Sequence, residues 1–193
     1  MRNTPKLKTE YQQHKPTLRK QFSYRCAYCE TRESELGGSR SFGIDHYKPK
    51  NKFPHLINVL DNLLYVCNEC NSYKGSYWPT LLQKSLGEYI LNLRTHNIDS
   101  HLDKNDFAWQ GKTNTGKWNI SRLRLSSERR IQTRKDRKNF QGILENLKKA
   151  YIELQCKHDN TIETEKRTDI QTELQQYPEQ IETIERTLNG VME

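Results

Sequence analysis

Residues 67–75 read CNECNSYKG, a stretch that holds two cysteines, two asparagines and one lysine. Cys67 and Cys70 form a C-x-x-C pair, and Cys26 and Cys29 form another, with 37 residues between the two pairs. Two such pairs supply the four thiolates that close the coordination shell of a tetrahedral structural zinc ion. We therefore expect one zinc site here, in preference to four unconnected thiols or a redox pair.

The composition is polar for a chain of 193 residues. Only 33% of the residues are hydrophobic and the mean hydropathy is -1.04, which is low for a domain held by apolar burial alone. The length allows one domain with an extension, or two small domains. A bound metal would help to hold so small a core. The fifth cysteine, Cys156, lies in a helical pattern and is interpreted as a free thiol.

The charge is positive overall and unevenly distributed. A formal net charge of +8 and a pI near 9.2 favour a polyanionic partner such as nucleic acid. Residues 118–149 hold ten bases and three acids, a net of +7, whereas residues 160–193 hold eight acids and three bases, a net of -5. The basic run could follow a nucleic-acid backbone or form a solvated face, and the two regions imply different neighbours.

The sequence gives no sign of a membrane protein or of a secreted one. No run approaches the roughly 20 apolar residues of a membrane span, and residues 1–15 lack the apolar core of a signal peptide. We expect a cytoplasmic protein without a membrane partner. Cysteines in that reducing compartment more often hold metal than form disulfides.

Local patterns around the cysteines predict a strand, a loop, a second strand and a short helix. The first strand should end near His46, because Pro49 cannot continue a central ladder. The apolar run LLYV at residues 63–66 predicts the second strand, and residues 68–75 read as a helical turn closed by Gly75. The fold class is thus α+β, with a small zinc-stapled core.

Most of the remaining sequence is predicted to be helical. A short helix is expected over residues 16–22, a helix over 78–93 and a small hairpin over 106–120. From Ser126 onward apolar residues recur at steps of three and four, and Pro178 should kink or restart the last helix. This C-terminal helical extension is either a packing face or a helical hairpin that docks a partner.

Polar residues between and beside the cysteine pairs suit phosphodiester hydrolysis, which needs a proton acceptor for the attacking water and positive charge near the leaving oxygen. A histidine such as His46 suits the first task because its ordinary pKa is about 6.5. Asp45 and the carboxamide of Asn71 offer oxygen ligands for Mg²⁺. Neighbours in a strand point to opposite faces, so Asp45 and His46 share a site only if the strand ends or bends there.

The stretches IDHYKPK (residues 44–50) and DNLLYVCNECNSYKG (residues 61–75) resemble the HNH, or ββα-metal, endonucleases in the subset with a four-cysteine zinc knuckle. The resemblance covers about a quarter of the chain. It implies that His46 is the general base, that Asp45 and Asn71 ligate a catalytic Mg²⁺ or Mn²⁺, and that Asn62 orients the loop after His46.

A finer resemblance extends over most of the chain. RCAYCE, IDHYKPK, NLLYVCNECNSYKG and the later WNISRLRLSSERRIQTR are similar to the PtuB-type HNH proteins of Septu and retron-associated antiphage defence systems. It implies a PtuA-type ABC ATPase as partner and, where a retron is present, its reverse transcriptase and multicopy DNA. It also implies that the C-terminal helices or the basic segment contact the ATPase.

We accordingly divide the chain into an N-terminal arm and helix (1–23), an HNH nuclease core (24–80), a mixed connector (81–125) and a helical, partner-binding region (126–193). The candidates for contact with nucleic acid are basic residues near the motif and in the basic run: Lys48, Lys50, Lys74, Arg122 and Arg124. His55 could contact phosphate or metal, or be a solvated loop residue.

The function expected is a metal-dependent HNH endonuclease that acts as the effector of an antiphage complex. The alternative is a catalytically inert zinc-ribbon subunit that binds nucleic acid or serves as an adaptor. A purely scaffolding protein is a third reading. The sequence does not distinguish DNA from RNA as the substrate.

Overall fold

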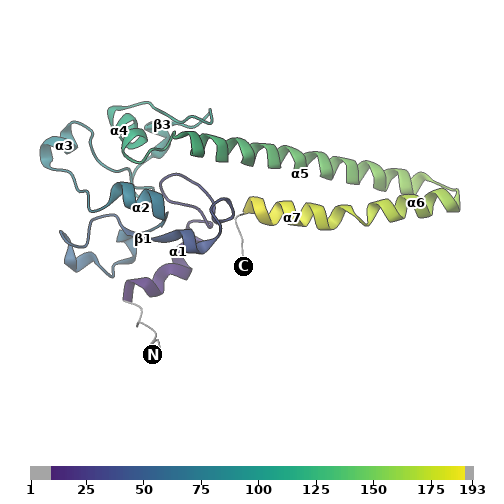
Figure 1. Ribbon diagram of the computed structural model, residues 1–193, viewed down its shortest axis with the longest axis horizontal. Coiled ribbons are helices and arrows are strands. Elements are labelled where there is room, and N and C mark those ends of the chain that lie inside the picture. Colours follow the sequence, from purple (N-terminus) through teal and green to yellow (C-terminus); the bar gives the residue numbers. More distant parts are fainter. Residues whose placement is uncertain (1–9, 190–193) are drawn as a thin grey trace.

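Two long antiparallel helical stretches extend from one end of the protein in the computed structural model, which describes residues 10–189 (Figure 1). The other elements gather at the base of these stretches. Residues 1–9, which begin the expected N-terminal arm, and residues 190–193 lie outside the described part.

The described chain starts with a 3-10 turn, Glu10–His14, that leads into helix α1, Lys15–Gln21. Pro16 stands in the first turn of α1, where a missing backbone N–H leaves no helical hydrogen bond unmade. Leu18 is fully buried, and α1 packs against the second strand of the sheet described next. The short helix expected over residues 16–22 is confirmed.

Two strands and a helix form the centre of the body. Strand β1, Phe42–His46, pairs antiparallel with β2, Leu63–Cys67, so that Phe42 lies opposite Cys67 and His46 opposite Leu63. Every residue of β2 is buried, and helix α2, Asn68–Lys74, follows directly and packs against both strands. Gly75 ends α2 with a φ of +54°, a backbone conformation that glycine adopts without strain. The expected order of strand, loop, strand and helix is confirmed.

The connector differs from expectation in two places. The helix expected over 78–93 is reduced to α3, Leu81–Ser85. The hairpin expected over 106–120 is wrong: β4, Gln110–Gly111, pairs with the earlier β3, Leu102–Asp103, and helix α4, Asn114–Arg122, takes up the remainder.

The start of α4 explains why the hairpin does not form. Thr113 caps this helix, because its Oγ1 accepts a hydrogen bond from the N–H of Gly116 at 3.1 Å. Gly116 lies so close to His101 that a Cβ on the glycine would stand 1.9 Å from the carbonyl oxygen of His101. Gly116, within the stretch where a hairpin was expected, therefore allows the start of α4 to approach His101 closely.

The helical arm consists of three helices: α5, Glu128–Asn160; α6, Thr164–Leu174; and α7, Tyr177–Asn189. Helix α5 runs outward and α6 and α7 return beside it, so that the end of α7 lies back at the body (Figure 1). Helix α7 starts one residue before Pro178, which confirms the expected restart. The C-terminal helical extension is confirmed with it.

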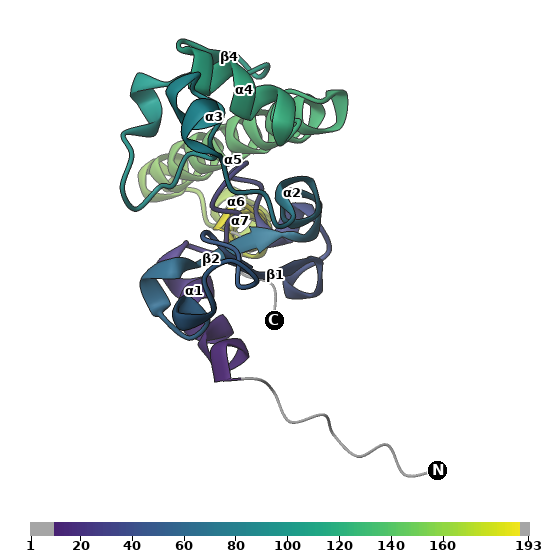
Figure 2. The same ribbon diagram turned by 90° about the vertical axis from the view of Figure 1, so that its left-hand side faces the viewer.

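One hydrophobic core joins the sheet, the cysteine region and the connector. Its buried members include Leu18, Phe42, residues 63–67, Trp109, Leu123 and Leu125. Figure 2 shows α3, α4 and β4 gathered near the start of α5, on the opposite side of the β1–β2 pair from α1. In the helical arm only Ile170 and Leu174 are buried apolar residues among those described, so the arm adds little core of its own.

None of the helices in the range 10–189 combines the length and the apolar composition that crossing a bilayer requires.

Candidate functional site

The four paired cysteines come together at the junction of three segments. Cys26 and Cys29 lie in the turn after α1, Cys67 ends β2, and Cys70 lies in the first turn of α2. Their sulfur atoms all lie within 4.8 Å of one another, and all four side chains are buried.

The cluster fits a zinc ion. Two sulfurs bound to one tetrahedral zinc at about 2.3 Å stand about 3.8 Å apart, and the Sγ atoms of Cys29 and Cys67 are 3.8 Å apart. The backbone N–H of Tyr28 donates to Cys26 Sγ at 3.5 Å, and that of Cys70 donates to Cys67 Sγ at 3.5 Å. Such N–H donors stabilise thiolates, so the four cysteines can hold zinc.

Helix α5 contributes a buried arginine to this cluster. Arg130 is 4% exposed, and its Nη2 donates to Cys70 Sγ at 3.2 Å. A guanidinium here offsets part of the negative charge that four thiolates carry around one dication. Arg130 could not be distinguished from its exposed neighbour Arg129 by sequence, since both stand in one basic run.

A second site lies at the other end of the β1–β2 pair. An open hollow of about 480 Å³ is lined by Asp45 and His46 from the end of β1 and by Asn71 from α2, together with Tyr11, Pro49 and Lys50. The pairing of β1 with β2, and of both strands with α2, thus brings the three expected residues to one surface.

The orientation of the His46 ring is fixed by the backbone. Its Nε2 lies 2.9 Å from the carbonyl oxygen of Ile57, and Tyr11 packs edge-on against the ring at 4.8 Å between centroids. Because a carbonyl only accepts, Nε2 carries the proton and Nδ1 of the neutral ring is a proton acceptor. Burial lowers the pKa of His46 below its ordinary value, so the neutral form predominates at neutral pH.

Asp45 is held by two partners inside the protein. Its Oδ1 accepts from Lys74 Nζ at 2.8 Å and its Oδ2 accepts from the hydroxyl of Tyr28 at 2.6 Å. Burial and the neighbouring Asp45 charge raise the pKa of Tyr28 far above its ordinary value, so this hydroxyl stays a donor. Asp45 is 4% exposed, but a carboxylate offers about four lone-pair sites, which leaves it able to ligate a cation.

Lys74 therefore does not lie at the surface, where it was expected to contact nucleic acid. It is 1% exposed, and its Nζ also donates to the backbone oxygen of His46 at 2.8 Å. The ammonium that we expected to meet nucleic acid instead ties the end of α2 to the end of β1. Sequence spacing did not indicate this, because a fully buried lysine is rare.

Asn71 and Asn62 occupy different environments. Asn71 is half-buried and lines the hollow, and its carboxamide makes no hydrogen bond to a described residue. Asn62 is buried and clamps the loop after His46: its Oδ1 accepts from Lys48 N at 2.8 Å, and its Nδ2 donates to the oxygens of Lys48 at 3.1 Å and Leu56 at 3.2 Å. Leu56 precedes Ile57, the residue that holds the His46 ring.

The other basic candidates are dispersed. Lys50 is exposed at the hollow, with its Nζ over the Tyr11 ring, whereas Lys48 turns toward the rings of Phe53 and Trp78. Arg122 and Arg124 lie against Tyr77 and Tyr73, on the flank of α2. Of the five candidates, the structure brings only Lys50 to the open surface of the hollow.

Comparison with known proteins agrees with this geometry. Residues 26–76 match the family model described as HNH endonuclease. The chain is similar to the Septu protein PtuB of Bacillus thuringiensis, with 30% identity over 107 residues; the aligned stretch is 55% of this chain and 38% of that relative, well under half of its length. No solved structure gives a significant match.

Proposed function

We propose that this protein, whose residues 26–76 form an HNH endonuclease domain, hydrolyses phosphodiester bonds in nucleic acid with the help of a divalent metal ion. One observation carries the proposal: Asp45, His46 and Asn71 line one open hollow, and a backbone carbonyl orients the ring of His46. The hollow thus combines a proton acceptor with two oxygen ligands and has room for a phosphate.

His46 is the general base in this proposal. Its Nδ1 takes a proton from the attacking water, the water oxygen bonds to phosphorus, and the P–O3′ bond breaks. The 3′ oxygen leaves with the electron pair and takes up a proton from solvent. The bond between His46 Nε2 and Ile57 supports this role because it keeps the unprotonated nitrogen available.

Asp45 and Asn71 are the ligands proposed for Mg²⁺ or Mn²⁺. When bound, the ion supplies positive charge against the phosphate and the leaving oxygen. Two protein ligands would suit such an ion, because Mg²⁺ in proteins is usually held by one or two side chains and keeps several waters. The donor set fits, since Asp45 retains lone pairs beside Lys74 and Tyr28 and the carboxamide of Asn71 makes no hydrogen bond within residues 10–189.

Asn62 is a positioning residue in this account. Its carboxamide joins Lys48 to Leu56, the two sides of the loop that begins after His46 and returns to Ile57. It touches neither the proposed substrate nor the ion. Its contribution is to keep the Ile57 carbonyl where the His46 ring needs it.

The similarity to a Septu protein supports a role in antiphage defence. In this proposal the chain works in the cytoplasm with a PtuA-type ABC ATPase and, where a retron is present, with its reverse transcriptase and multicopy DNA. Residues 24–80 supply the nuclease core and residues 81–125 connect it to the helical region. That region, residues 126–193, binds the ATPase.

A second candidate function is an inert subunit that binds nucleic acid without cutting it. One observation favours it: Lys74 already neutralises Asp45, which is nearly buried. If that ion pair excludes the divalent cation, the HNH residues would keep the fold without catalysis.

The deciding experiment is purification of the complex from its native operon, followed by incubation with double-stranded DNA, single-stranded DNA and RNA. Each substrate is tested with Mg²⁺, with Mn²⁺ and with EDTA, in the presence of the ATPase and its nucleotide. We expect cleavage of at least one substrate that EDTA abolishes. Salt-sensitive binding with no turnover under any of these conditions would support the inert subunit instead.

A further inference from the structure

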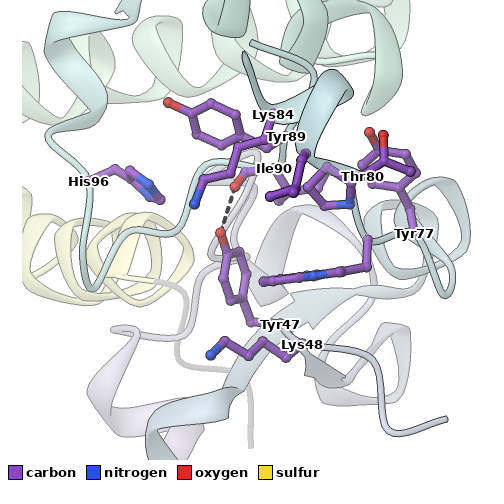
Figure 3. A pocket seen from close by; sticks show the side chains of 11 residues that line it. Tyr47, Lys48, Tyr77, Thr80, Lys84, Tyr89, Ile90 and His96 are labelled. Carbon is purple, nitrogen blue, oxygen red and sulfur yellow. Dashed lines mark hydrogen bonds between the residues drawn. The ribbon is translucent and has the colours of Figure 1, made fainter. Parts of the chain in front are cut away.

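A second hollow is lined in part by Tyr47 and Lys48, the two residues that follow His46; we call it the aromatic hollow. Its volume is about 350 Å³, which is within the size of small-ligand sites. Aromatic rings and lysines line it: Tyr47, Lys48, Tyr77, Trp78, Lys84 and Tyr89. Figure 3 shows the rings of Tyr47, Tyr77 and Tyr89 around one space, with Lys84 and Lys48 reaching it from different sides.

The aromatic rings of this hollow are held in place by the fold. The hydroxyl of Tyr47 donates to the oxygen of Ile90 at 2.9 Å, a bond drawn in Figure 3, and that of Tyr77 donates to the oxygen of Glu88 at 2.5 Å. Trp78 packs edge-on against Tyr47, at 5.7 Å between centroids. Rings fixed in this way form a stacking platform without the entropic cost of ordering flexible side chains.

The charge of the hollow is positive. Lys48 Nζ lies 5.9 Å from the centre of the Trp78 ring, Lys84 is exposed on α3, and no acidic side chain lines the space among the described residues. Rigid rings beside unpaired ammonium groups are the combination with which proteins bind single-stranded nucleic acid, since bases stack on the rings while phosphates meet the cations.

The position of the hollow connects it to the proposed catalytic site. His46 and Tyr47 are consecutive and turn to different sides of the chain, as neighbours at a strand end do. Tyr47 and Lys48 line the aromatic hollow, whereas His46, Pro49 and Lys50 line the hollow of the proposed catalytic site. The two hollows thus share the stretch 46–50 as a wall, so one bound strand could reach both.

We propose that the aromatic hollow binds an unpaired nucleobase of the strand being cut, stacked on the ring of Trp78 or Tyr47, while Lys48 and Lys84 bind the flanking phosphates. This inference rests on the proposed function only in taking nucleic acid as the ligand. It adds that the substrate is single-stranded or locally unpaired, and DNA and RNA bases would both fit by the same chemistry.

The test measures binding of the full-length protein in EDTA, so that no cleavage is needed. The probes are fluorescein-labelled oligothymidylate, oligouridylate and a DNA hairpin duplex, and the dissociation constant is followed by anisotropy. Trp78→Ala should weaken single-strand binding by roughly 5- to 150-fold, the effect of one stacked base, and Trp78→Phe should restore most of it. Duplex binding should change little, and the two single strands report whether the site prefers DNA or RNA.

A charge variant tests the same hollow without disturbing its packing. Lys84→Gln should reduce the slope of log K against log salt for the single strand by about 0.7, the loss of one phosphate contact. Lys157→Gln, at an exposed lysine of α5 outside the basic run 118–149, is the matched control and should leave the slope unchanged. Equal effects of the two lysines would contradict the proposal.

An oligothymidylate series with one abasic position locates the base. The abasic site that costs most affinity with the wild-type protein should cost almost nothing with Trp78→Ala, because both changes remove the same stack. If the affinity lost through the abasic position and the affinity lost through Trp78→Ala instead add up, the inference is overturned. A Trp78→Ala protein that binds single strands normally but no longer co-purifies with the ATPase would overturn it too, since the hollow would then belong to a protein contact.

These outcomes separate the inference from the proposed function. Cleavage by the wild-type complex together with unchanged strand binding by Trp78→Ala keeps the nuclease and removes the base site. Absence of cleavage together with Trp78-dependent binding removes the nuclease and keeps the base site.

Discussion

Lys74 is the residue whose environment departs furthest from what its type suggests. A lysine just after the last motif residue reads as a contact for a phosphate, yet it is buried and bonded to Asp45 and to the backbone of His46. The family resemblance implied one site for Asp45, His46 and Asn71, on the condition that the strand ends or bends near His46, and β1 does end at His46. The ion pair beneath that site was not predictable, because it depends on how far α2 tilts into the sheet.

Removing the Lys74 ammonium should leave a buried carboxylate with only Tyr28 as a partner. We expect Lys74→Met to lower the free energy of unfolding by about 3–5 kcal/mol, the usual cost of breaking a buried pair on one side. Urea titration with zinc in excess measures this, and Lys52→Met, at an exposed lysine of the next loop, is the control. If both variants unfold at the same urea concentration, Lys74 does not hold the site together.

The β1–β2–α2 unit is the element that sequence reasoning located well. The apolar run predicts β2, the proline predicts the end of β1 and the glycine predicts the end of α2. Each of these features affects the backbone of adjacent residues, so each can be recognised within a short stretch of sequence. The connector was located poorly: residues 110–111 pair with residues 102–103, and Gly116 meets His101 across the fold. Those contacts depend on packing between elements, which a pattern in one segment does not contain. Arg130 beside Cys70 is a similar case.

The cysteine cluster should decide whether this unit folds. Structural zinc contributes about 10 kcal/mol or more in small modules, so Cys26→Ser should lose bound zinc and most of the cooperative unfolding transition. Metal content by atomic emission and thermal unfolding by circular dichroism provide the two measurements. Cys156→Ser is the matched control, because Cys156 is exposed on the helical arm and should be dispensable.

A Cys26→Ser protein with full zinc content and unchanged melting would refute the structural zinc site.

In the whole molecule, the helical arm contacts the body in two places, near the start of α5 and at the end of α7. Near the start of α5, Arg134 lies 3.8 Å from the centre of the Trp109 ring, and Arg137 forms an ion pair with Glu35 at 2.6 Å. Where α7 ends, Ser34 Oγ donates to the oxygen of Thr187 at 2.6 Å. These contacts hold the arm against the body, from which it projects (Figure 1).

Exposed apolar side chains on α5 mark the surface that we expect to meet the ATPase. Ile143 and Ile152 are 47% and 58% exposed, although isoleucine is usually buried. Nine residues separate the two isoleucines, so they lie on opposite sides of the helix, and Ile143→Asp and Ile152→Asp are tested as separate variants. The variant on the docking side should abolish co-purification of the ATPase while zinc content and melting stay unchanged. Asn146→Asp, at an exposed position one turn from Ile143, adds a negative charge without removing an apolar side chain and is the charge control for Ile143→Asp.

Normal recovery of the ATPase with both single variants would place its docking surface elsewhere than at Ile143 or Ile152.

In the proposed mechanism the imidazole of His46 accepts the proton at the hollow that it shares with Asp45 and Asn71. The most direct measurement compares His46→Ala with His55→Ala in the native complex, on whichever substrate the wild type cuts in Mg²⁺. His55 is exposed on the following loop and lines neither hollow, which makes it the matched control. We predict that His46→Ala cuts roughly 100- to 10,000-fold more slowly, with zinc content and melting unchanged, while His55→Ala cuts normally. A His46→Ala complex that cuts at the wild-type rate would contradict the account.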